Sequence, residues 1–501
     1  MDRMKQYMTM KISINGKWLA VCSLIYLYLS LLIFFVTWTK WYIALLAIGA
    51  TIYGCISIMK DYAPKDQPVL HVYSLALISV FLLMAGLVSG WGGWMTQWAD
   101  WAKHNALLND LVNYDWPVYY REAANPSMLT YYIGQYLVPA LIGKVTGSFR
   151  VAEVMMYIWG EVGLFLIAFQ LMRIMNASMF AKQVCVVVIL VGFGGCLFLS
   201  EMLLDLFSGI AGFDKHWMTA VNGSVLQYRN HYVNLSWVMP QCIAAWLTVS
   251  LWWERRKKIS VYIPLMLPSL LYGAFSFLGI ALMAMICAIY ESILEKRSLI
   301  VFVKQAFSPA NIASMVAVGI PLLLYFSGNV FSAKDPSAGF SIQHINIWLY
   351  VSFCLGHFGI YALLSGKRHL QNGMFIAAVI LLSILPFFKI GYYNDLVMST
   401  SIPAIFVIMI CVIDTIYDKP DSFAAGALCV CLAISALYPM NDLKSAVYLN
   451  RIDALDHDMS VPSLITTSDR SSEQMTWKYN YYSYNVDNNL FIEMLARKPF
   501  R

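Results

Sequence analysis

Residues 89–126, SGWGGWMTQWADWAKHNALLNDLVNYDWPVYYREAANP, determine how the rest of the chain is interpreted. They follow an apolar run long enough to cross a bilayer, but they are too polar to lie inside one. The stretch holds five tryptophans, the type of side chain that settles at a membrane–water boundary, at positions 91, 94, 98, 101 and 116. Among them stand Asp100, Lys103, His104, Asp110 and Asp115. The stretch therefore predicts a site held against a membrane surface.

The composition of the whole chain predicts a protein that crosses the membrane many times. Of its 501 residues, 60% are hydrophobic and only 12% are charged, whereas soluble domains carry roughly 25% charged residues. The net charge of +6 is not a sign of nucleic-acid binding, because the distribution of basic residues around apolar runs matters more than their sum. The ten cysteines show no metal-ligand spacing, so we expect neither structural zinc nor a disulfide framework.

Apolar runs of about 20 residues predict an all-α bundle of about 13 transmembrane helices. We place these spans near residues 18–38, 41–59, 69–88, 151–172, 182–200, 235–253, 260–274, 275–291, 309–327, 344–364, 374–388, 396–416 and 422–438. The pair 260–274 and 275–291 is equally compatible with one tilted helix, because Pro264, Pro268 and Gly273 interrupt it.

Basic residues orient the bundle, since cytoplasmic loops are enriched in Lys and Arg. If 128–141 is a helix lying on the outer surface rather than a span, most basic loops face the cytoplasm together with the N-terminus. These include Arg173, Lys182, Arg255 to Lys258, Lys296, Arg297, Lys304, Lys367, Arg368 and Lys419. The outer loops are then 89–150, 201–234, 328–343 and 389–395. Residues 1–68 form two N-terminal spans, 69–438 the core, and 439–501 a short outer tail that is able to cover the mouth of the bundle.

The first loop carries the strongest candidate for chemistry. Asp100 and His104 are four residues apart and share one face of a helix. A carboxylate at a wet membrane boundary can act as general base toward an acceptor hydroxyl, and a histidine can orient a phosphate or share a proton. Asp110 and Asp115 follow in the same loop. The alternative is that these residues are solvated side chains between lipid-facing tryptophans.

Further candidates lie in the second outer loop and at the start of a late span. Glu201 and Asp205 are spaced to share a helical face and suit a hard divalent cation such as Mg²⁺ or Mn²⁺, unless they only mark a polar helix end. Candidates for substrate binding in this loop are Lys215, His216 and Arg229 for a phosphate and Trp217 and Tyr228 for a sugar ring. Lys103 of the first loop is a further candidate for substrate binding. Asp395 is either a helix cap or a lining residue of the same outer cavity. Within one span, Glu153 and Glu161 fall near the same helical face, and Glu161 is either a protonated structural residue or part of an ion path.

The order of these features resembles the GT-C superfamily of membrane glycosyltransferases. The resemblance rests on a span, a long acidic and aromatic first outer loop, a surface helix, a span opening with Arg, and a second acidic outer loop. The surface-helix segment is NPSMLTYYIGQYLVPALIGKVTGSFRVAE (125–153), in which Asn125-Pro126-Ser127 replaces the usual double proline. Shorter stretches resemble a group of bacterial, Firmicutes-type polytopic proteins: LSEMLLDLFSG (199–209), KHWMTAV (215–221), VLQYRN (225–230), LSWVMPQCIAAWL (235–247) and KIGYYNDLVMSTSIPAIFVIM (389–409). Ser399 stands where that group usually has Arg.

The resemblance implies an enzyme of the bacterial cell membrane that transfers a sugar from a polyprenyl-phosphate carrier to a glycan or lipid acceptor on the outer face. Asp100 matches the first-loop acid that serves as base or metal ligand, and Glu201 and Asp205 match the second acidic position. Phosphate departure would be steadied by Arg229, Lys215 or His216. Two other hypotheses stay open. One is a transporter or flippase of a lipid-linked glycan, which favours ionisable residues deep in several spans; the other is a glycan polymerase or ligase.

Overall fold

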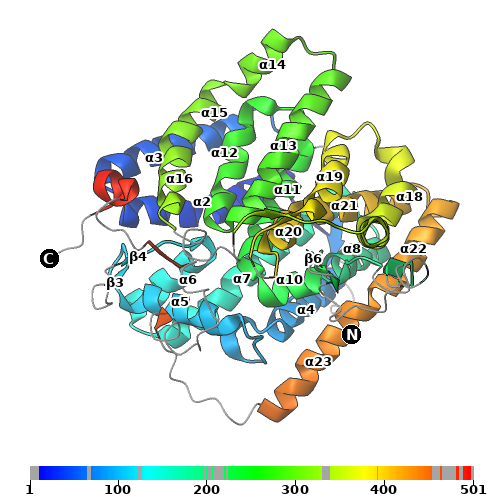
Figure 1. Cartoon of the computed structure of the whole chain (residues 1–501), viewed down its shortest axis with the longest axis horizontal. Helices are drawn as coiled ribbons and strands as arrows, with labels where there is room; N and C mark the ends of the chain where they lie inside the picture. The colour runs from blue at the N-terminus through cyan, green and yellow to red at the C-terminus, as the bar shows by residue number, and fades with distance from the viewer. Residues whose placement is uncertain are drawn as a thin grey trace.

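The computed structural model of the chain is a bundle of helices with a few short strands at its ends (Figure 1). It describes residues 11–64, 69–120, 127–196, 199–200, 202–203, 206, 219–221, 224–329, 339–391, 393–453, 463–464, 481–483 and 489–497. The fold within these ranges is all-α, as the apolar runs predict.

The first half of the bundle is formed by nine of the described helices. They are α2 (Gly16–Trp38), α3 (Trp41–Met59), α4 (Val72–Val88), α5 (Trp101–Asn113), α6 (Gly134–Thr146), α7 (Phe149–Ile174), α8 (Phe180–Gly192), α10 (His231–Trp237) and α11 (Met239–Arg255). The remaining helices are α12 (Tyr262–Met266), α13 (Ala274–Leu294), α14 (Leu299–Ala306), α15 (Pro309–Ser314), α16 (Ile320–Ser327), α17 (Ile347–Cys354), α18 (Ile360–His369), α19 (Gly373–Ile384), α20 (Asp395–Thr400), α21 (Ile402–Asp418), α22 (Phe423–Ser435) and α23 (Leu437–Asp453).

Short antiparallel strands pair both between neighbouring segments and between segments that are far apart in the chain. The strands are β1 (Lys11–Ser13) with β2 (Val69–His71), β3 (Tyr119–Tyr120) with β4 (Ser127–Leu129) and β9 (Tyr482–Ser483), β5 (Thr219–Val221) with β6 (Ser224–Leu226), and β7 (Ser341–Ile342) with β8 (Phe388–Lys389). The pairing of β4 with β9 matters most here, because it carries part of the C-terminal segment to the first loop.

Eight helical stretches of the described chain are long and apolar enough to cross a membrane, which identifies a helical membrane protein. They are Gly16–Trp38, Trp41–Met59, Phe149–Ile174, Ala274–Leu294, Leu299–Ser327, Ile347–His369, Asp395–Asp418 and Phe423–Leu449. Each coincides with one of the 13 expected spans. The other five expected spans coincide with shorter helices, Val72–Val88, Phe180–Gly192, α11, Ile259–Leu271 and Gly373–Phe387. The full number of 13 crossings therefore stays a prediction.

The span expected at 182–200 is shorter than the sequence suggests. Helix α8 ends at Gly192, and an extended segment follows it. The amide of Cys196 donates to the carbonyl of Gly356 (2.7 Å), and the carbonyl of Phe193 accepts from the amide of His231 (2.8 Å). These partners replace the helical hydrogen bonds after Gly192, so hydropathy alone overestimates the length of the helix.

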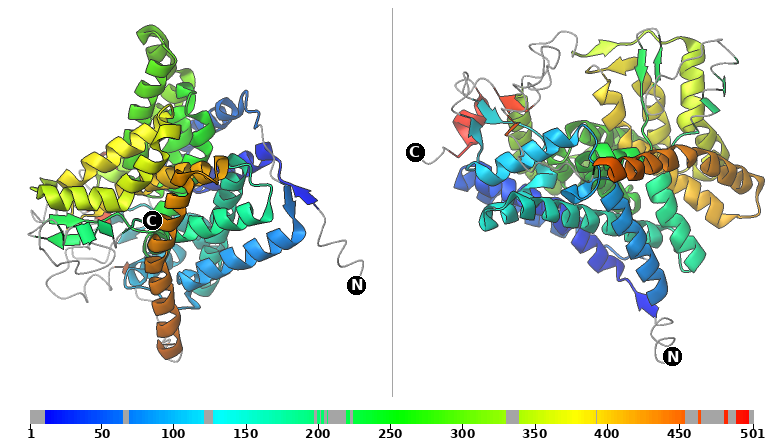
Figure 2. Two further views of the ribbon diagram at one scale, coloured as in Figure 1. Left: turned by 90° about the vertical axis from the view of Figure 1, so that its right-hand side faces the viewer. Right: turned by 90° about the horizontal axis from the view of Figure 1, so that it is seen from below.

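Two further helix ends, at the start of the surface helix and at the start of the C-terminal tail, also differ from the expected positions. The surface helix expected at 128–141 begins later, as α6, after strand β4. With 13 residues, α6 is about 20 Å long and too short to cross an apolar layer about 30 Å thick. At the other end, α23 continues the helix of α22 past residue 438, so the first part of the 439–501 tail is helical and projects from the bundle (Figures 1 and 2).

Helix α21 forms the centre of the bundle. Every residue from Ile402 to Ile413 is buried, because α21 packs against α11, α13, α18, α19 and α22. A helix that is apolar on all sides is stable only when neighbours cover its whole circumference. The short helix α20 precedes it directly, so residue 395 is fixed relative to the core.

Ion pairs connect the C-terminal ends of the long helices. Arg173 in the last turn of α7 donates two hydrogen bonds to Glu254 near the end of α11 (2.5 and 2.6 Å). Arg256, just after α11, pairs with Glu291 near the end of α13 (3.2 Å). Arg368 in α18 pairs with Asp414 in α21 (2.6 Å). These contacts place several of the basic residues expected to face the cytoplasm at neighbouring helix ends, while the orientation relative to the membrane stays a prediction.

Candidate functional site

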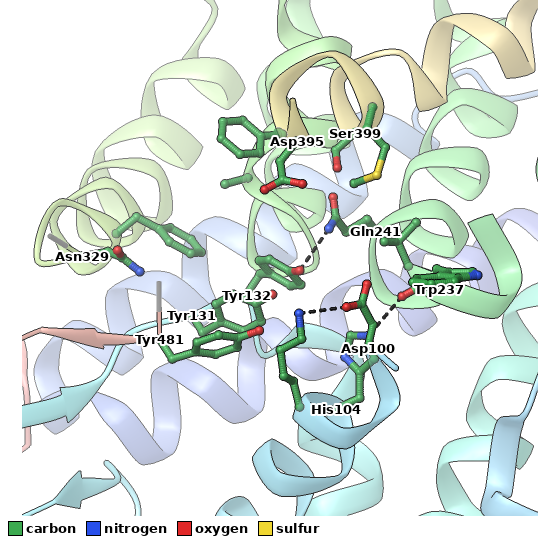
Figure 3. Close-up of a pocket in the computed structure, with 16 residues that line it drawn as sticks. Asp100, His104, Tyr131, Tyr132, Trp237, Gln241, Asn329, Asp395, Ser399 and Tyr481 are labelled. Carbon is green, nitrogen blue, oxygen red and sulfur yellow. Dashed lines mark hydrogen bonds and ion pairs between the residues drawn. The ribbon is translucent and has the colours of Figure 1, made fainter. Parts of the chain in front are cut away.

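A cavity of about 350 Å³ lies at the opposite end of α11 from these ion pairs. It is lined by Trp237 at the end of α10 and by Val238 and Gln241 at the start of α11. Glu254 stands at the far end of α11, about 20 Å from Gln241. Figure 3 shows the lining side chains. They come from the start of α5, the segment before α6, the end of α10, the starts of α11, α13 and α20, the end of α16, and the C-terminal segment. The lining residues are Asp100, Lys103, His104, Tyr131, Tyr132, Trp237, Val238, Gln241, Ala274, Phe275, Phe326, Asn329, Asp395, Met398, Ser399 and Tyr481.

The start of α5 contributes the three neighbouring polar residues that the sequence selects. Asp100 precedes the helix, and its carbonyl accepts from the amides of Lys103 (3.1 Å) and His104 (3.2 Å). This first turn places the Lys103 ammonium 2.8 Å from the Asp100 carboxylate. Both side chains are partly exposed, at 29% for Lys103 and 30% for Asp100. The pair therefore stands at the wall of the cavity and is accessible to a ligand.

The charges of this pair support each other. Burial would raise the pKa of Asp100, but Lys103, His104 and Arg229 lower it below its ordinary value. Burial would lower the pKa of Lys103, but Tyr481 and Asp100 raise it above its ordinary value. At neutral pH the cavity thus holds a carboxylate and an ammonium group side by side.

His104 is held by both of its ring nitrogens. Nε2 lies 3.1 Å from the carbonyl oxygen of Trp237, and Nδ1 contacts the hydroxyl of Tyr136. Because a carbonyl only accepts, Nε2 carries the proton and Nδ1 accepts from Tyr136. Burial lowers the pKa of His104 more than Asp100 raises it, so the ring is neutral. This geometry makes His104 a positioning residue that fixes α5 against α6 and the end of α10.

Asp395 reaches the cavity from the opposite side, at the start of α20. In Figure 3 its carboxylate faces the cavity from above, and Asp100 faces it from below. Within the described part of the chain, Asp395 has no hydrogen-bond or ion-pair partner. The structure thus brings two carboxylates together that the sequence separates by almost 300 residues.

Two residues of the VLQYRN stretch have different environments. Arg229 is buried behind Trp237, with its guanidinium 5.7 Å from the centre of the indole ring and its Nε donating to Gln227 (3.1 Å). Its charge acts on both Asp100 and Asp395. Tyr228 points into the core, where its hydroxyl donates to the carbonyl of Leu382 (2.6 Å). Of the two, only Arg229 is placed to influence the cavity.

The remaining predicted site residues lie outside the described residues: Glu201, Asp205, Lys215, His216 and Trp217. Within the described part of the chain, no three His, Cys, Asp or Glu side chains come together as metal ligands. The divalent cation therefore stays a prediction that rests on Glu201 and Asp205.

A wall of tyrosines was not predicted. Tyr131 lies between Tyr132 and Tyr481, with its ring centre 3.7 Å from that of Tyr132 and 4.3 Å from that of Tyr481 and with the rings tilted by 32° in both pairs. Gln241 donates to the hydroxyl of Tyr132 (3.0 Å). Tyr481 belongs to the C-terminal segment and is held there by strand pairing and by its carbonyl, which accepts from the amide of Thr130 (2.8 Å). The many tyrosines of 477–484 were the only signal in the sequence.

Asp110 anchors another part of the C-terminal segment. Its Oδ2 accepts from the hydroxyl of Tyr120 (2.8 Å) and from the amide of Leu464 (3.0 Å). Burial raises the pKa of Asp110 from 3.8 to about 6, although Tyr120, Ser463 and Leu464 counteract the rise. Asp115, in contrast, is exposed. Asp110 is therefore a structural residue that titrates in an accessible pH range.

This titration predicts a pH-dependent stability. The folded carboxyl keeps its proton up to about pH 6, whereas the unfolded one loses it near 3.8. The protonated Asp110 carboxyl therefore contributes to the free energy of unfolding at low pH. This contribution, about 3 kcal/mol in total, is lost as the pH rises through 6. We expect the thermal midpoint of the wild type to fall between pH 4 and 7 more steeply than that of Asp110→Asn. Asp115→Asn is the control, and equal slopes for all three proteins would contradict the prediction.

No protein-family model, curated protein or solved structure matches the chain. The site is therefore interpreted from its own geometry.

Proposed function

We propose that the protein is a membrane glycosyltransferase that moves a sugar from a polyprenyl-phosphate-type carrier to a hydroxyl group of a cell-envelope acceptor. The observation that carries the proposal is the cavity itself. Two carboxylates, Asp100 and Asp395, face each other across it, beside the cations Lys103 and Arg229. It lies at the end of helices that are long enough to cross a membrane, where a lipid-borne donor and a water-borne acceptor can meet.

The proposed reaction inverts the anomeric carbon. The acceptor oxygen attacks this carbon from the face opposite the phosphate and forms the new glycosidic bond. The bond to the phosphate oxygen breaks, and its electron pair stays on the phosphate. The hydroxyl proton passes to a carboxylate of the cavity. The Lys103 ammonium group, with the charge of Arg229 behind it, stabilises the leaving phosphate, and such stabilisation is strong where water is scarce.

Reconstitution of the purified full chain in lipid vesicles tests this proposal. Each of a panel of polyprenyl-phosphate sugars is added, and release or transfer of the sugar is measured for wild type and Asp100→Asn at equal protein abundance. We expect the wild type to act on at least one donor and Asp100→Asn to be slower by on the order of tenfold or more, because Lys103 loses the partner that positions it. Asp115→Asn, which changes an exposed carboxylate of the same loop, should leave the rate unchanged. Equal rates for wild type and Asp100→Asn would remove Asp100 from the mechanism.

One observation favours the alternative of a transporter. Glu161 lies in α7, a candidate span, and is 4% exposed. Within the described residues, neither carboxyl oxygen has a hydrogen-bond partner. Ionisable groups inside spans often mark proton or substrate paths. If no donor loses its sugar while labelled lipid-linked glycan crosses the vesicle membrane, and Glu161→Gln abolishes that movement, the transporter replaces the transferase.

A further inference from the structure

We infer that Asp395 is the general base of the proposed transfer, the group that takes the proton from the acceptor hydroxyl. The inference rests on the proposed function, because a base is needed only where a hydroxyl attacks. From the sequence we expect this role for Asp100 and regard Asp395 as a cap or a lining residue. The surroundings of the two carboxylates instead favour Asp395 as the base.

The first argument is availability. One oxygen of Asp100 is engaged by the Lys103 ammonium group at 2.8 Å, and a carboxylate that is paired with a cation is a weaker proton acceptor. Asp395 lines the same cavity, and within the described part of the chain it has no hydrogen bond or ion pair. A general base must present a lone pair within hydrogen-bond reach of the reacting hydroxyl. Asp395 meets that requirement with both of its oxygens.

The second argument is the rigid support of Asp395 by its neighbour Asn394. Asn394 is fully buried and has a left-handed backbone, with φ of 58°. Its side-chain amide donates to the carbonyls of Val225 (2.8 Å) and Phe388 (3.0 Å). Its side-chain oxygen accepts from the amides of Ile390 (3.3 Å) and Val397 (3.4 Å). A strained residue held by four hydrogen bonds is typical of a functional position, because it fixes the residue that follows.

The third argument is the space around the carboxylate. Gly391 also has a positive φ, of 79°, and a Cβ at this position would lie 3.0 Å from Oδ2 of Asp395. Any side chain here would crowd the carboxylate that faces the cavity. Glycine at 391 thus permits both the turn and an unobstructed Asp395.

The two carboxylates, on opposite sides of the cavity, then have different roles in the proposed transfer. Asp395 accepts the proton as the acceptor oxygen bonds to the anomeric carbon and the carbon–phosphate oxygen bond breaks. Asp100 acts through Lys103, which it positions for the leaving phosphate. Asp100 is then a positioning residue and Asp395 a catalytic residue.

A nucleophile that carries no proton separates these two roles. Wild type, Asp395→Asn, Asp395→Glu and Asp100→Asn are reconstituted with the polyprenyl-phosphate sugar that the wild type uses, with water alone or with sodium azide. Release of free sugar and formation of glycosyl azide are both measured. We expect Asp395→Asn to release sugar to water about 100-fold more slowly than wild type. Azide should restore turnover of Asp395→Asn as glycosyl azide, because azide needs no base. Asp100→Asn should gain nothing from azide.

Each other outcome has a defined meaning. If Asp395→Asn releases sugar at the wild-type rate, or if azide rescues Asp100→Asn and not Asp395→Asn, Asp395 is not the base. If Asp395→Asn does not fold, as judged by its thermal midpoint, Asp395→Glu decides: slow release to water that azide restores supports a displaced base. An unchanged rate, or slow release that azide does not restore, overturns the inference. If the wild type acts on no donor with water or azide, the transfer itself is wrong, and the role of Asp395 falls with it.

Discussion

Replacing Lys103 with methionine is expected to lower the rate of sugar transfer about 10²- to 10³-fold, the usual loss when a preorganised group that stabilises developing charge is removed. The ammonium group of Lys103 is a cation within hydrogen-bond distance of Asp100 at the wall of the cavity. In the proposed transfer, its loss would remove the charge that stabilises the departing phosphate. It also leaves the Asp100 carboxylate without this partner, where it would repel the same phosphate. The effect should fall mainly on kcat, since the charge on the phosphate grows as the bond breaks.

Three variants separate these causes. Lys103→Arg keeps the charge and should retain most of the rate. The double variant Lys103→Met/Asp100→Asn also lacks the carboxylate that would repel the phosphate. It should therefore be faster than Lys103→Met alone. Lys144→Met is the matched control: Lys144 lies in α6 of the same loop, where it donates to the carbonyls of Val112 (3.3 Å) and Tyr114 (2.6 Å). If the Lys103→Met variant transfers sugar as fast as the Lys144→Met variant, the Lys103 cation takes no part in the proposed transfer.

The positions of the helices could be predicted because they depend on the length of apolar runs. All 13 expected spans coincide with helices, even the pair at 260–274 and 275–291, which the structure resolves into Ile259–Leu271 and α13. The end of α8 could not be predicted. It depends on hydrogen bonds from 193–196 to residues that are far away in the sequence, such as Gly356. Hydropathy contains no information about such partners.

The candidate site was predictable only where its residues are close in sequence. Asp100, Lys103 and His104 lie on one helical turn, so their spacing places them together. The same spacing does not show that both nitrogens of His104 are engaged, because Tyr136 and Trp237 come from other helices. The contact of Tyr481 with Tyr131 was equally hidden, since it depends on the pairing of β9 with β4. The sequence left Asp395 between two interpretations, and only the structure shows what surrounds it.

Replacing Glu254 with glutamine is expected to reduce the free energy of unfolding by about 3 kcal/mol, because it removes the carboxylate that pairs with a buried guanidinium. Arg173 is 1% exposed and donates to both oxygens of Glu254, which also accepts from the hydroxyl of Tyr62 (2.6 Å). The oxygen of Gln170 also accepts from the guanidinium (2.8 and 3.3 Å), but this amide oxygen is neutral and does not replace the charge of the carboxylate. Helix α7 is then held less firmly to α11, so the thermal midpoint in detergent micelles should be lower.

The control for this prediction is Glu295→Gln. Glu295 pairs with Lys257 (3.1 Å) and with Arg297, and it is 31% exposed. A pair that is this exposed contributes about 0–1 kcal/mol, so the midpoint should change little. In Glu254→Gln, a second change of Arg173→Met should recover much of the lost stability, because it also removes the buried charge that the carboxylate offsets. Two results would contradict the prediction: equal unfolding temperatures for Glu254→Gln and Glu295→Gln, or a further decrease of the midpoint on adding Arg173→Met. Either would show that the ion pair with the buried charge does not stabilise the fold. The packing of α7 on α11 would then hold that end of the bundle together without the ion pair.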